Sequence, residues 1–470
     1  MARPCVTIHT LHQLALIRLE LPPMLRVAIP VVLAELGWMA MGVVDTIMVG
    51  PLGPQAIAAS GVSNSLQMSL AIFGMGLLLG LDTLVSHAFG ARRIDECNRW
   101  FWHGVAAAAV IAPLLVAISW AMLQLVPAMG FHPEVGPLVQ RYFGILLWSG
   151  APLVFYAAFR RYLQAIHAVT PVMIALVTAN IINAVGNWAF IHGHLGAPQL
   201  GLVGSAVATL VARIYLVALL LGAVLYYDFK RRTGLLHSSR AIERKRVWRM
   251  IHLGFPAAST VALEVGVFAA ATALAGKLTP VAAASHQIAL NIAAVAFMVP
   301  LGLASAGAVR VGHAVGAQDA KRAAAAGWTA IVLGVTFMLA TAAAFVLIPR
   351  ALIGLFSTDA AVVALGSSLL FVAAIFQLFD GLQGVVTGVL RGLGDTRTPM
   401  ITNLAAHWLF GLPVGYGLCF TFGAGVIGLW IGLSTGLTIA GAVLLYSWSR
   451  QISTLDISGI THTPDASVGG

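Results

Sequence analysis

Four acidic residues stand inside long apolar stretches of this chain: Glu35, Asp45, Glu264 and Asp380. A charged carboxylate at the middle of a membrane-spanning helix costs about 2.5–3.5 kcal/mol on insertion scales. Such a residue is therefore expected to face a polar interior or a partner. Because buried carboxylates can hold a cation or exchange a proton, ion binding is the first chemistry that the sequence indicates.

Amide and hydroxyl side chains could complete one of these sites. Asn183 and Asn187 are four residues apart and share one face of a helix. Together with Asp45 they make a set of oxygen ligands suited to Na⁺, or a buried acid that takes up a proton, and Thr209 could add a hydroxyl group. The alternative role of the two asparagines is hydrogen bonding between helices.

Membrane-spanning helices are the elements that must position these residues. Of the 470 residues, 59% are hydrophobic and only 9% are charged, whereas soluble domains carry about 25% charged residues. This composition excludes a water-soluble enzyme, and long unbroken apolar runs argue against a β-barrel. We expect an all-α polytopic membrane protein with twelve transmembrane helices over residues 24–49, 57–87, 101–125, 138–160, 168–192, 201–227, 250–276, 280–312, 323–347, 362–390, 398–421 and 426–449.

The basic residues favour one orientation of these spans. If the N-terminus is cytoplasmic, the chain ends and the even-to-odd loops hold 22 of the 26 lysines and arginines, and the outside loops hold only Arg141, Lys277 and Arg350. Because basic loops stay on the cytoplasmic side, we expect a multi-pass protein of the plasma membrane, the bacterial inner membrane, with both termini in the cytoplasm.

The second half of the chain repeats the first at a shift of about 226 residues. Pro30 corresponds to Pro256, and the segment 87–91 corresponds to 313–317. Each copy has six helices, an even number, so both copies point the same way, as in transporters that rock two bundles about a central cavity. The expected organisation is a cytoplasmic leader (1–23), an N-lobe (24–227), a cytoplasmic linker (228–249), a C-lobe (250–450) and a cytoplasmic tail (451–470).

Several motifs occur in order along the chain: residues 44–48 in the first helix, 81–91 closing the second, 180–183 with Asn187 in the fifth, Glu264 in the seventh, Asp380 in the tenth, and 388–397 before the eleventh. This pattern resembles the multidrug and toxic compound extrusion (MATE) family, NorM-like branch, from about residue 24 to 449. The resemblance implies a two-lobed antiporter that exports organic, often cationic, compounds in exchange for Na⁺ or H⁺.

The resemblance also implies roles for the N-lobe residues. In the family, the positions matching Asp45, Asn183 and Asn187 belong to a cation- or proton-linked site. The match at Thr209 is loose. These residues are therefore candidates for coupling, with Thr209 a possible lining residue of the cavity.

In the C-lobe, NorM-like relatives carry the cation site at the positions of Glu264 and Asp380, which makes Na⁺ possible at this pair. The family often has a tyrosine four residues before the second acid, but this chain has Phe376. One oxygen ligand is thus missing, although an aromatic face for a cation remains. An emptied site would leave two like charges, one of which should take up a proton, so the same pair can serve Na⁺ or H⁺.

Other polar residues of the spans could line the cavity. Glu35 lies in the first helix, and Gln287 and Asn291 are four residues apart in the eighth. For Gln287 and Asn291, packing between helices is the alternative role.

No cofactor is expected besides the coupling ion. The expected partners are small organic substrates and membrane lipid, with no nucleic acid and no obligate protein partner.

Two other functions fit the sequence less well. A polysaccharide or lipid-intermediate flippase of the same broad superfamily should line its cavity with cationic groups, but only Arg213 lies well within an expected span. A membrane-embedded enzyme is not expected, because the chain has no His-Glu-x-x-His motif, no paired cysteines and no Ser/His/Asp set at one membrane depth. A cation-coupled multidrug efflux antiporter remains the main hypothesis.

The orientation can be tested with single cysteines. A cysteine placed in the 228–249 linker should react with a membrane-impermeant maleimide only from the cytoplasm, and one replacing Gly196 only from outside. Labelling in intact cells and in inverted vesicles measures the two accessibilities. Labelling of both positions from the same side would contradict the twelve-span topology.

Overall fold

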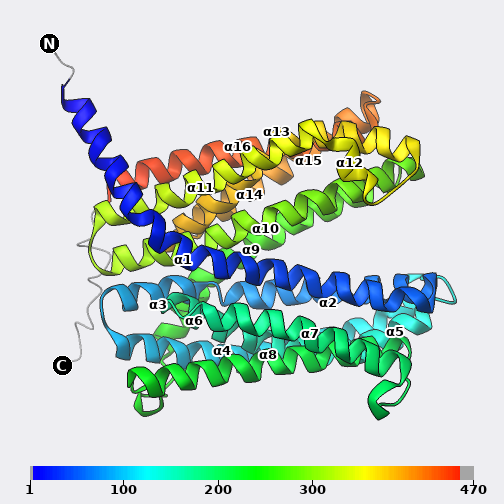
Figure 1. Ribbon diagram of the computed structural model, residues 1–470, viewed down its shortest axis with the longest axis horizontal. Helices are drawn as coiled ribbons and strands as arrows, with labels where there is room; N and C mark the ends of the chain where they lie inside the picture. Colours follow the sequence, from blue (N-terminus) through cyan, green and yellow to red (C-terminus); the bar gives the residue numbers. More distant parts are fainter. Residues whose placement is uncertain (1–3, 456–470) are drawn as a thin grey trace. The chain divides into compact units, whose positions relative to one another are not determined.

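The computed structural model describes residues 4–455, with side chains described from residue 18 onward. All regular structure in this range is helical (Figure 1), which confirms the expected fold class. Twelve helical stretches of the described range are long and apolar enough to cross a membrane, as expected. Residues 456–470, most of the expected tail, lie outside the described residues.

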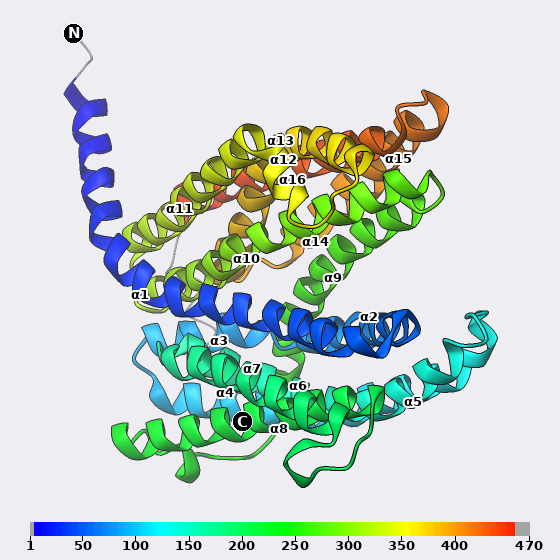
Figure 2. The same ribbon diagram turned by 45° about the vertical axis from the view of Figure 1, so that its right-hand side comes forward.

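The described residues form two compact units. The first, here called the N-unit, comprises residues 33–85 and 93–258. Within it α7 packs along α8, and α6 contacts both α4 and α8 (Figure 2). Its helices are the second part of α1 (Pro4–Val49), α2 (Pro54–Leu77), most of α3 (Gly80–Gly90), α4 (Ile94–Leu125), α5 (Gly136–Leu146), α6 (Gly150–Ala165), α7 (Thr170–His192), α8 (Leu202–Arg231) and the beginning of α9 (Arg244–Ala275).

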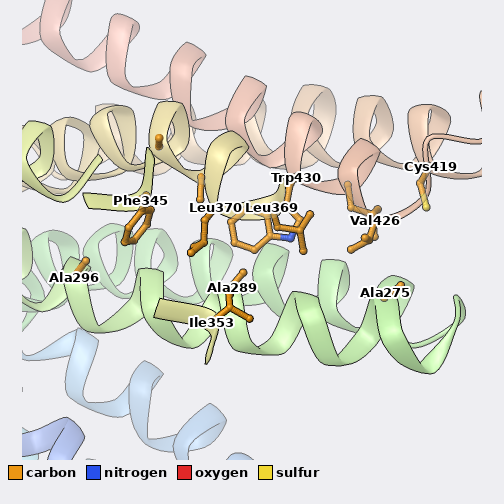
Figure 3. Close-up of a cluster of buried hydrophobic side chains, with 14 residues drawn as sticks. Ala275, Ala289, Ala296, Phe345, Ile353, Leu369, Leu370, Cys419, Val426 and Trp430 are labelled. Atoms are coloured by element: carbon orange, nitrogen blue, oxygen red, sulfur yellow. The ribbon is translucent and has the colours of Figure 1, made fainter. Parts of the chain in front are cut away.

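The second unit, here called the C-unit, comprises the residues up to 32, residues 86–92 and the chain from 259 onward. Helix α13 packs against α10, α11 and α16. In its core Ala289 of α10 leaves room for Leu369 and Leu370 of α13 and Trp430 of α16 (Figure 3). Its further helices are α10 (Pro280–Gly316), α11 (Ala320–Leu347), α12 (Pro349–Gly354), α13 (Ala360–Leu393), α14 (Arg397–Asn403), α15 (Leu412–Tyr416) and α16 (Gly425–Ser453).

The helix expected over 398–421 changes its winding twice. After α14 the chain is π-helical over Leu404–Gly411 (η6), and after α15 again over Gly417–Thr421 (η7). Pro413 lies between the two segments and cannot donate a backbone hydrogen bond. The wider turns of a π-helix can accommodate the missing backbone hydrogen bond. Such turns are frequent at functional sites.

Four boundaries separate the two units along the chain, and two of them, after Val85 and after Arg92, enclose only residues 86–92. The other two fall inside helices, after Val32 in α1 and after Ala258 in α9. Each is two residues beyond a proline, Pro30 and Pro256, and the two boundaries are 226 residues apart (258 − 32), which is the shift of the sequence repeat. A proline removes one hydrogen bond inside a helix, so each boundary follows a weakened point of the helix.

An ion-pair cluster holds the first part of α1 in the C-unit. Helix α1 begins at Pro4 and continues into the first span, so residues 4–23 form no separate leader helix. The buried carboxylate of Glu20 pairs with Arg310 of α10 and accepts a 2.8 Å hydrogen bond from Arg322 of α11. This cluster therefore ties α1 to the beginning of α11 and the last turns of α10.

The chain between α8 and α9 is docked on α4 of the N-unit. Asn98 Nδ2 donates to the carbonyl oxygen of Thr233 at 2.8 Å. Trp102 Nε1 donates to the carbonyl oxygen of Leu235 at 3.1 Å. Because side chains of α4 satisfy backbone acceptors of this segment, the expected linker 228–249 is an ordered part of the N-unit.

Arg246 anchors the end of this linker. Its guanidinium donates to both carboxylate oxygens of Glu96, at 2.6 and 3.2 Å. It also donates to Glu243 at 2.9 Å and lies over the ring of Trp100, 5.1 Å from the centroid. A two-pronged pair between arginine and carboxylate fixes direction as well as distance, so this contact holds the linker in register with α4.

Replacement of Arg246 should release the linker. Arg246→Ala is expected to lower the free energy of docking by about 1 kcal/mol, because it removes a half-buried ion pair and a cation–π contact. Hydrogen exchange of residues 233–243 should then be several-fold faster. The matched control is Arg244→Ala, which removes the same charge from an exposed side chain. Equal protection in both variants would contradict the anchoring role.

Candidate ion-binding sites

Asp45 lies at the centre of a buried polar group in the N-unit. Its Oδ1 accepts hydrogen bonds from Asn183 Nδ2 at 3.0 Å and Asn187 Nδ2 at 2.8 Å, both from α7. Its Oδ2 accepts from Thr209 Oγ1 of α8 at 3.0 Å. All four side chains are buried. The structure therefore brings together Asp45, both asparagines and Thr209, as the spacing of the asparagines and the loose match of Thr209 suggested.

Two residues that sequence reasoning did not assign to this group also belong to it. Arg213 follows Thr209 by one turn of α8, is buried, and donates from Nη1 to Ser149 Oγ at 2.5 Å. Tyr142 of α5 is fully buried within electrostatic range of both Asp45 and Arg213. The sequence signal for Arg213 was its position, because it is a basic residue in mid-span four residues after Thr209.

Glu264 of α9 and Asp380 of α13 lie in one cluster of the C-unit, within electrostatic range of each other. Gln383 links this cluster to α14, since its Nε2 lies 3.5 Å from Glu264 Oε2 and 3.1 Å from Asn403 Oδ1. Asp380 Oδ1 has no hydrogen-bond partner in the described part of the chain. The cluster thus offers oxygen atoms from two carboxylates and two amides.

Sequence reasoning missed Gln383 and Asn403. Gln383 stands three residues after Asp380, so the two share a face of α13. Asn403 ends α14, directly before the π-helical turn. Its Nδ2 donates to the carbonyl oxygen of Pro399 at 2.9 Å, which leaves its Oδ1 facing Gln383. The helical spacing could have identified Gln383, but no spacing pointed to Asn403.

Phe376 is packed into an aromatic group one turn before Asp380. Its ring centroid lies 5.9 Å from that of Phe268 and 5.5 Å from that of Trp430. Trp430 Nε1 in turn donates to His286 Nδ1 at 3.1 Å. The ring of Phe376 on α13 therefore packs against aromatic side chains of α9 and α16.

The remaining candidates lie apart from both acidic groups. Glu35 forms a buried ion pair with Arg160 of α6, so its charge is compensated directly. Gln287 and Asn291 are exposed on α10, and Gln287 Nε2 donates to Asn291 Oδ1 at 3.4 Å. The structure does not bring these three residues into either acidic group.

The donor sets indicate which ions fit. Within the described residues no group of three or more His, Cys, Asp or Glu side chains could hold a metal ion. Carboxylate and amide oxygens are ligands for hard cations rather than for transition metals. The Glu264–Asp380 cluster therefore offers ligands of the kind that hard cations use.

Comparison with known proteins identifies the family. The family model named MatE matches residues 30–189 and 256–417, one segment in each half of the chain. The chain belongs to the MATE family. Its prolines at 30 and 256 and the four acids Glu35, Asp45, Glu264 and Asp380 fall inside the matched segments.

Curated relatives of this MATE protein belong to the NorM-like branch. The chain is 37% identical over 441 residues to a probable multidrug resistance protein NorM of Mesorhizobium japonicum, covering 92% of this chain and 94% of the relative. It is 38% identical over 440 residues to the multidrug resistance protein NorM of Burkholderia vietnamiensis, covering 91% and 93%. The resemblance inferred from the motifs is thus confirmed.

Solved MATE structures share the fold. The crystal structure of the eukaryotic MATE transporter AtDTX14 matches with a TM-score of 0.82 at 22% identity, covering 95% of this chain and 98% of that one. A MATE structure in the bent conformation matches with a TM-score of 0.84 at 20% identity, covering 96% and 99%. These likenesses confirm the helical architecture of the MATE family for this chain.

Proposed function

We propose that this MATE protein is a cation-coupled multidrug efflux antiporter. It exports organic cations in exchange for Na⁺ or H⁺ by alternating access, from the bacterial inner membrane with both termini in the cytoplasm. The curated relatives, which are named multidrug resistance proteins, support the choice of cargo. The observation that carries the proposal is the pair Glu264–Asp380, in which a half-buried and a buried carboxylate share one cluster.

This pair has the properties that ion exchange needs. Neither Glu264 nor Asp380 has a basic side chain within electrostatic range in the described part of the chain. Two uncompensated carboxylates in a poorly hydrated interior repel each other and favour uptake of a proton or a cation. A second cation, the cargo, then competes for the same negative charge. Binding of one ion thereby promotes release of the other, which is the requirement for exchange.

The N-unit group supplies a second candidate for coupling. Asp45 with Asn183 and Asn187 forms the other buried acidic group, so an ion or proton held there would act in parallel with the Glu264–Asp380 pair. The flippase alternative gains no support from the Glu264–Asp380 cluster. A phosphate-bearing cargo would need cationic contacts, whereas the Glu264–Asp380 cluster is acidic.

Replacement of the acids tests the proposal. Glu264→Gln and Asp380→Asn should each lower the rate of ethidium uptake into inverted vesicles, which corresponds to export from the cell, by at least about tenfold. The double variant should be little worse than either single one, because both changes remove the same shared site. Glu134→Gln, which changes an exposed carboxylate bonded to Gln55, is the control. Mild and additive effects would show that the two acids do not share a site.

The identity of the coupling ion follows from imposed gradients. A pH gradient and a Na⁺ gradient, applied separately to the same inverted vesicles, should each be scored for ethidium uptake. Phe376→Tyr places a hydroxyl one turn before Asp380 and should raise the apparent Na⁺ affinity several-fold, since it restores an oxygen ligand. An unchanged Na⁺ dependence, with the variant folded and active, would remove position 376 from the site.

A further inference from the structure

The end of α8 carries exposed aromatic side chains next to exposed basic ones. Tyr226 is 63% exposed and Phe229 is 84% exposed, and the exposed residues Lys230, Arg231 and Arg232 follow directly. The Nζ atom of Lys230 lies over the ring of Tyr226, 5.6 Å from the centroid. The stretch of α8 that is long and apolar enough to cross a membrane ends at Arg231. Aromatic rings and basic side chains at such an end lie at the level of the lipid headgroups.

The beginning of α9 repeats this combination. Trp248 is 67% exposed, and Lys245 and Arg249 on the same helix face are exposed as well. The spanning stretch of α9 begins one residue before Lys245. We call these three residues the α9 cluster, and residues 229–232 the α8 cluster. Each cluster therefore places basic side chains beside an aromatic ring at the end of a spanning helix.

Helix α4 of the N-unit fixes where both clusters lie. Asn98 and Trp102, which share one face of α4, donate to the segment that follows α8. On another face of α4, His103 Nε2 accepts a 3.0 Å hydrogen bond from the backbone N–H of Glu243. Glu96, on that same face, accepts hydrogen bonds from the first turn of α9. The linker thus crosses α4, and its two ends are held by a scaffold of the same unit.

The charge of this surface is not balanced by the protein. Residues 226–251 include eight lysines and arginines and two acidic residues, a net charge of +6 (8 − 2). Both acids are already engaged, because Asp228 accepts from the backbone N–H of Leu235 at 2.9 Å and Glu243 accepts from Arg246 at 2.9 Å. The basic side chains of the two clusters form no ion pair within the described residues. Fixed positive charge at this level of a membrane is complementary to anionic lipid headgroups.

We propose that the α8 and α9 clusters form a docking surface for anionic phospholipids of the leaflet that they face. The lipid phosphates lie among the basic side chains, and the rings of Phe229 and Trp248 lie against the region below the headgroups. Bound lipid adds to the contacts that hold the linker on α4, so the charge of the membrane sets how firmly the linker is held. This inference is independent of the coupling ion and of the cargo.

Hydrogen exchange in membranes of defined charge tests the proposal. The full-length protein is placed in phosphatidylcholine nanodiscs with and without phosphatidylglycerol. Amides of residues 233–243 should exchange at least about threefold more slowly when phosphatidylglycerol is present, because docked lipid disfavours opening of the linker. The difference should shrink at about 1 M NaCl, where the Debye length falls to about 3 Å. Equal exchange in the two membranes would overturn the proposal.

Variants of the α8 cluster show whether its charge is responsible. Lys230→Gln/Arg231→Gln/Arg232→Gln should lose most of the lipid-dependent difference while melting at the wild-type temperature in phosphatidylcholine, since these side chains form no ion pair in the described chain. Lys230→Arg/Arg231→Lys/Arg232→Lys keeps the charge and should keep the difference. Full protection of the folded glutamine variant would contradict the proposal.

The matched control removes three exposed basic residues from other loops, as Arg141→Gln/Lys277→Gln/Arg350→Gln. It lowers the net charge equally and should leave the lipid effect on residues 233–243 unchanged. Loss of the effect in this control would show a response to overall charge and refute a local surface.

Two further measurements complete the test. If the α8-cluster variant does not fold, Lys245→Gln/Arg249→Gln decides, since it should lose part of the lipid-dependent protection, and full protection would refute the proposal. Glycerol phosphate added to phosphatidylcholine nanodiscs should give no comparable slowing, because it lacks the membrane that brings headgroups to both clusters. Slowing equal to that by phosphatidylglycerol would identify a site for a free anion and overturn the assignment to lipid.

Discussion

Compensation of buried charge is the constraint on which the interior of this protein depends. The cores of the helix bundles are mostly apolar, so each charged side chain there needs a partner charge, a set of hydrogen bonds or a bound ion. Glu35 meets this need with a direct partner, Arg160. Asp45 meets it with three hydrogen-bond donors. Glu264 and Asp380 have only each other and neutral amides, so they are the unbalanced charges of the described interior.

The sequence repeat duplicates helices but not charges. The unit boundaries in α1 and α9 fall at equivalent positions after Pro30 and Pro256. Asp45, however, lies 15 residues after its proline (45 − 30), and Glu264 only 8 after its own (264 − 256). The two acids thus stand about two helical turns apart in their repeats. Duplication supplied a common scaffold, and each unit carries a different arrangement of charge on it.

Hydropathy predicted most of the fold, because long apolar runs allow few structures other than spanning helices. The group around Asp45 was also predictable, since one helical turn separates Asn183 from Asn187. A partner such as Asn403 was harder to predict. Its role depends on which helices pack together and on where the π-helical turn places its side chain. No periodicity in the sequence records either feature.

The positions of the unit boundaries have a further consequence. The beginning of α1 belongs to the C-unit, and the beginning of α9 belongs to the N-unit, so the two repeats exchange the starts of their first helices. Reciprocal exchange of an element is the arrangement found in domain-swapped dimers, here joined into one polypeptide. Neither half of the gene, expressed alone, would therefore encode a complete unit.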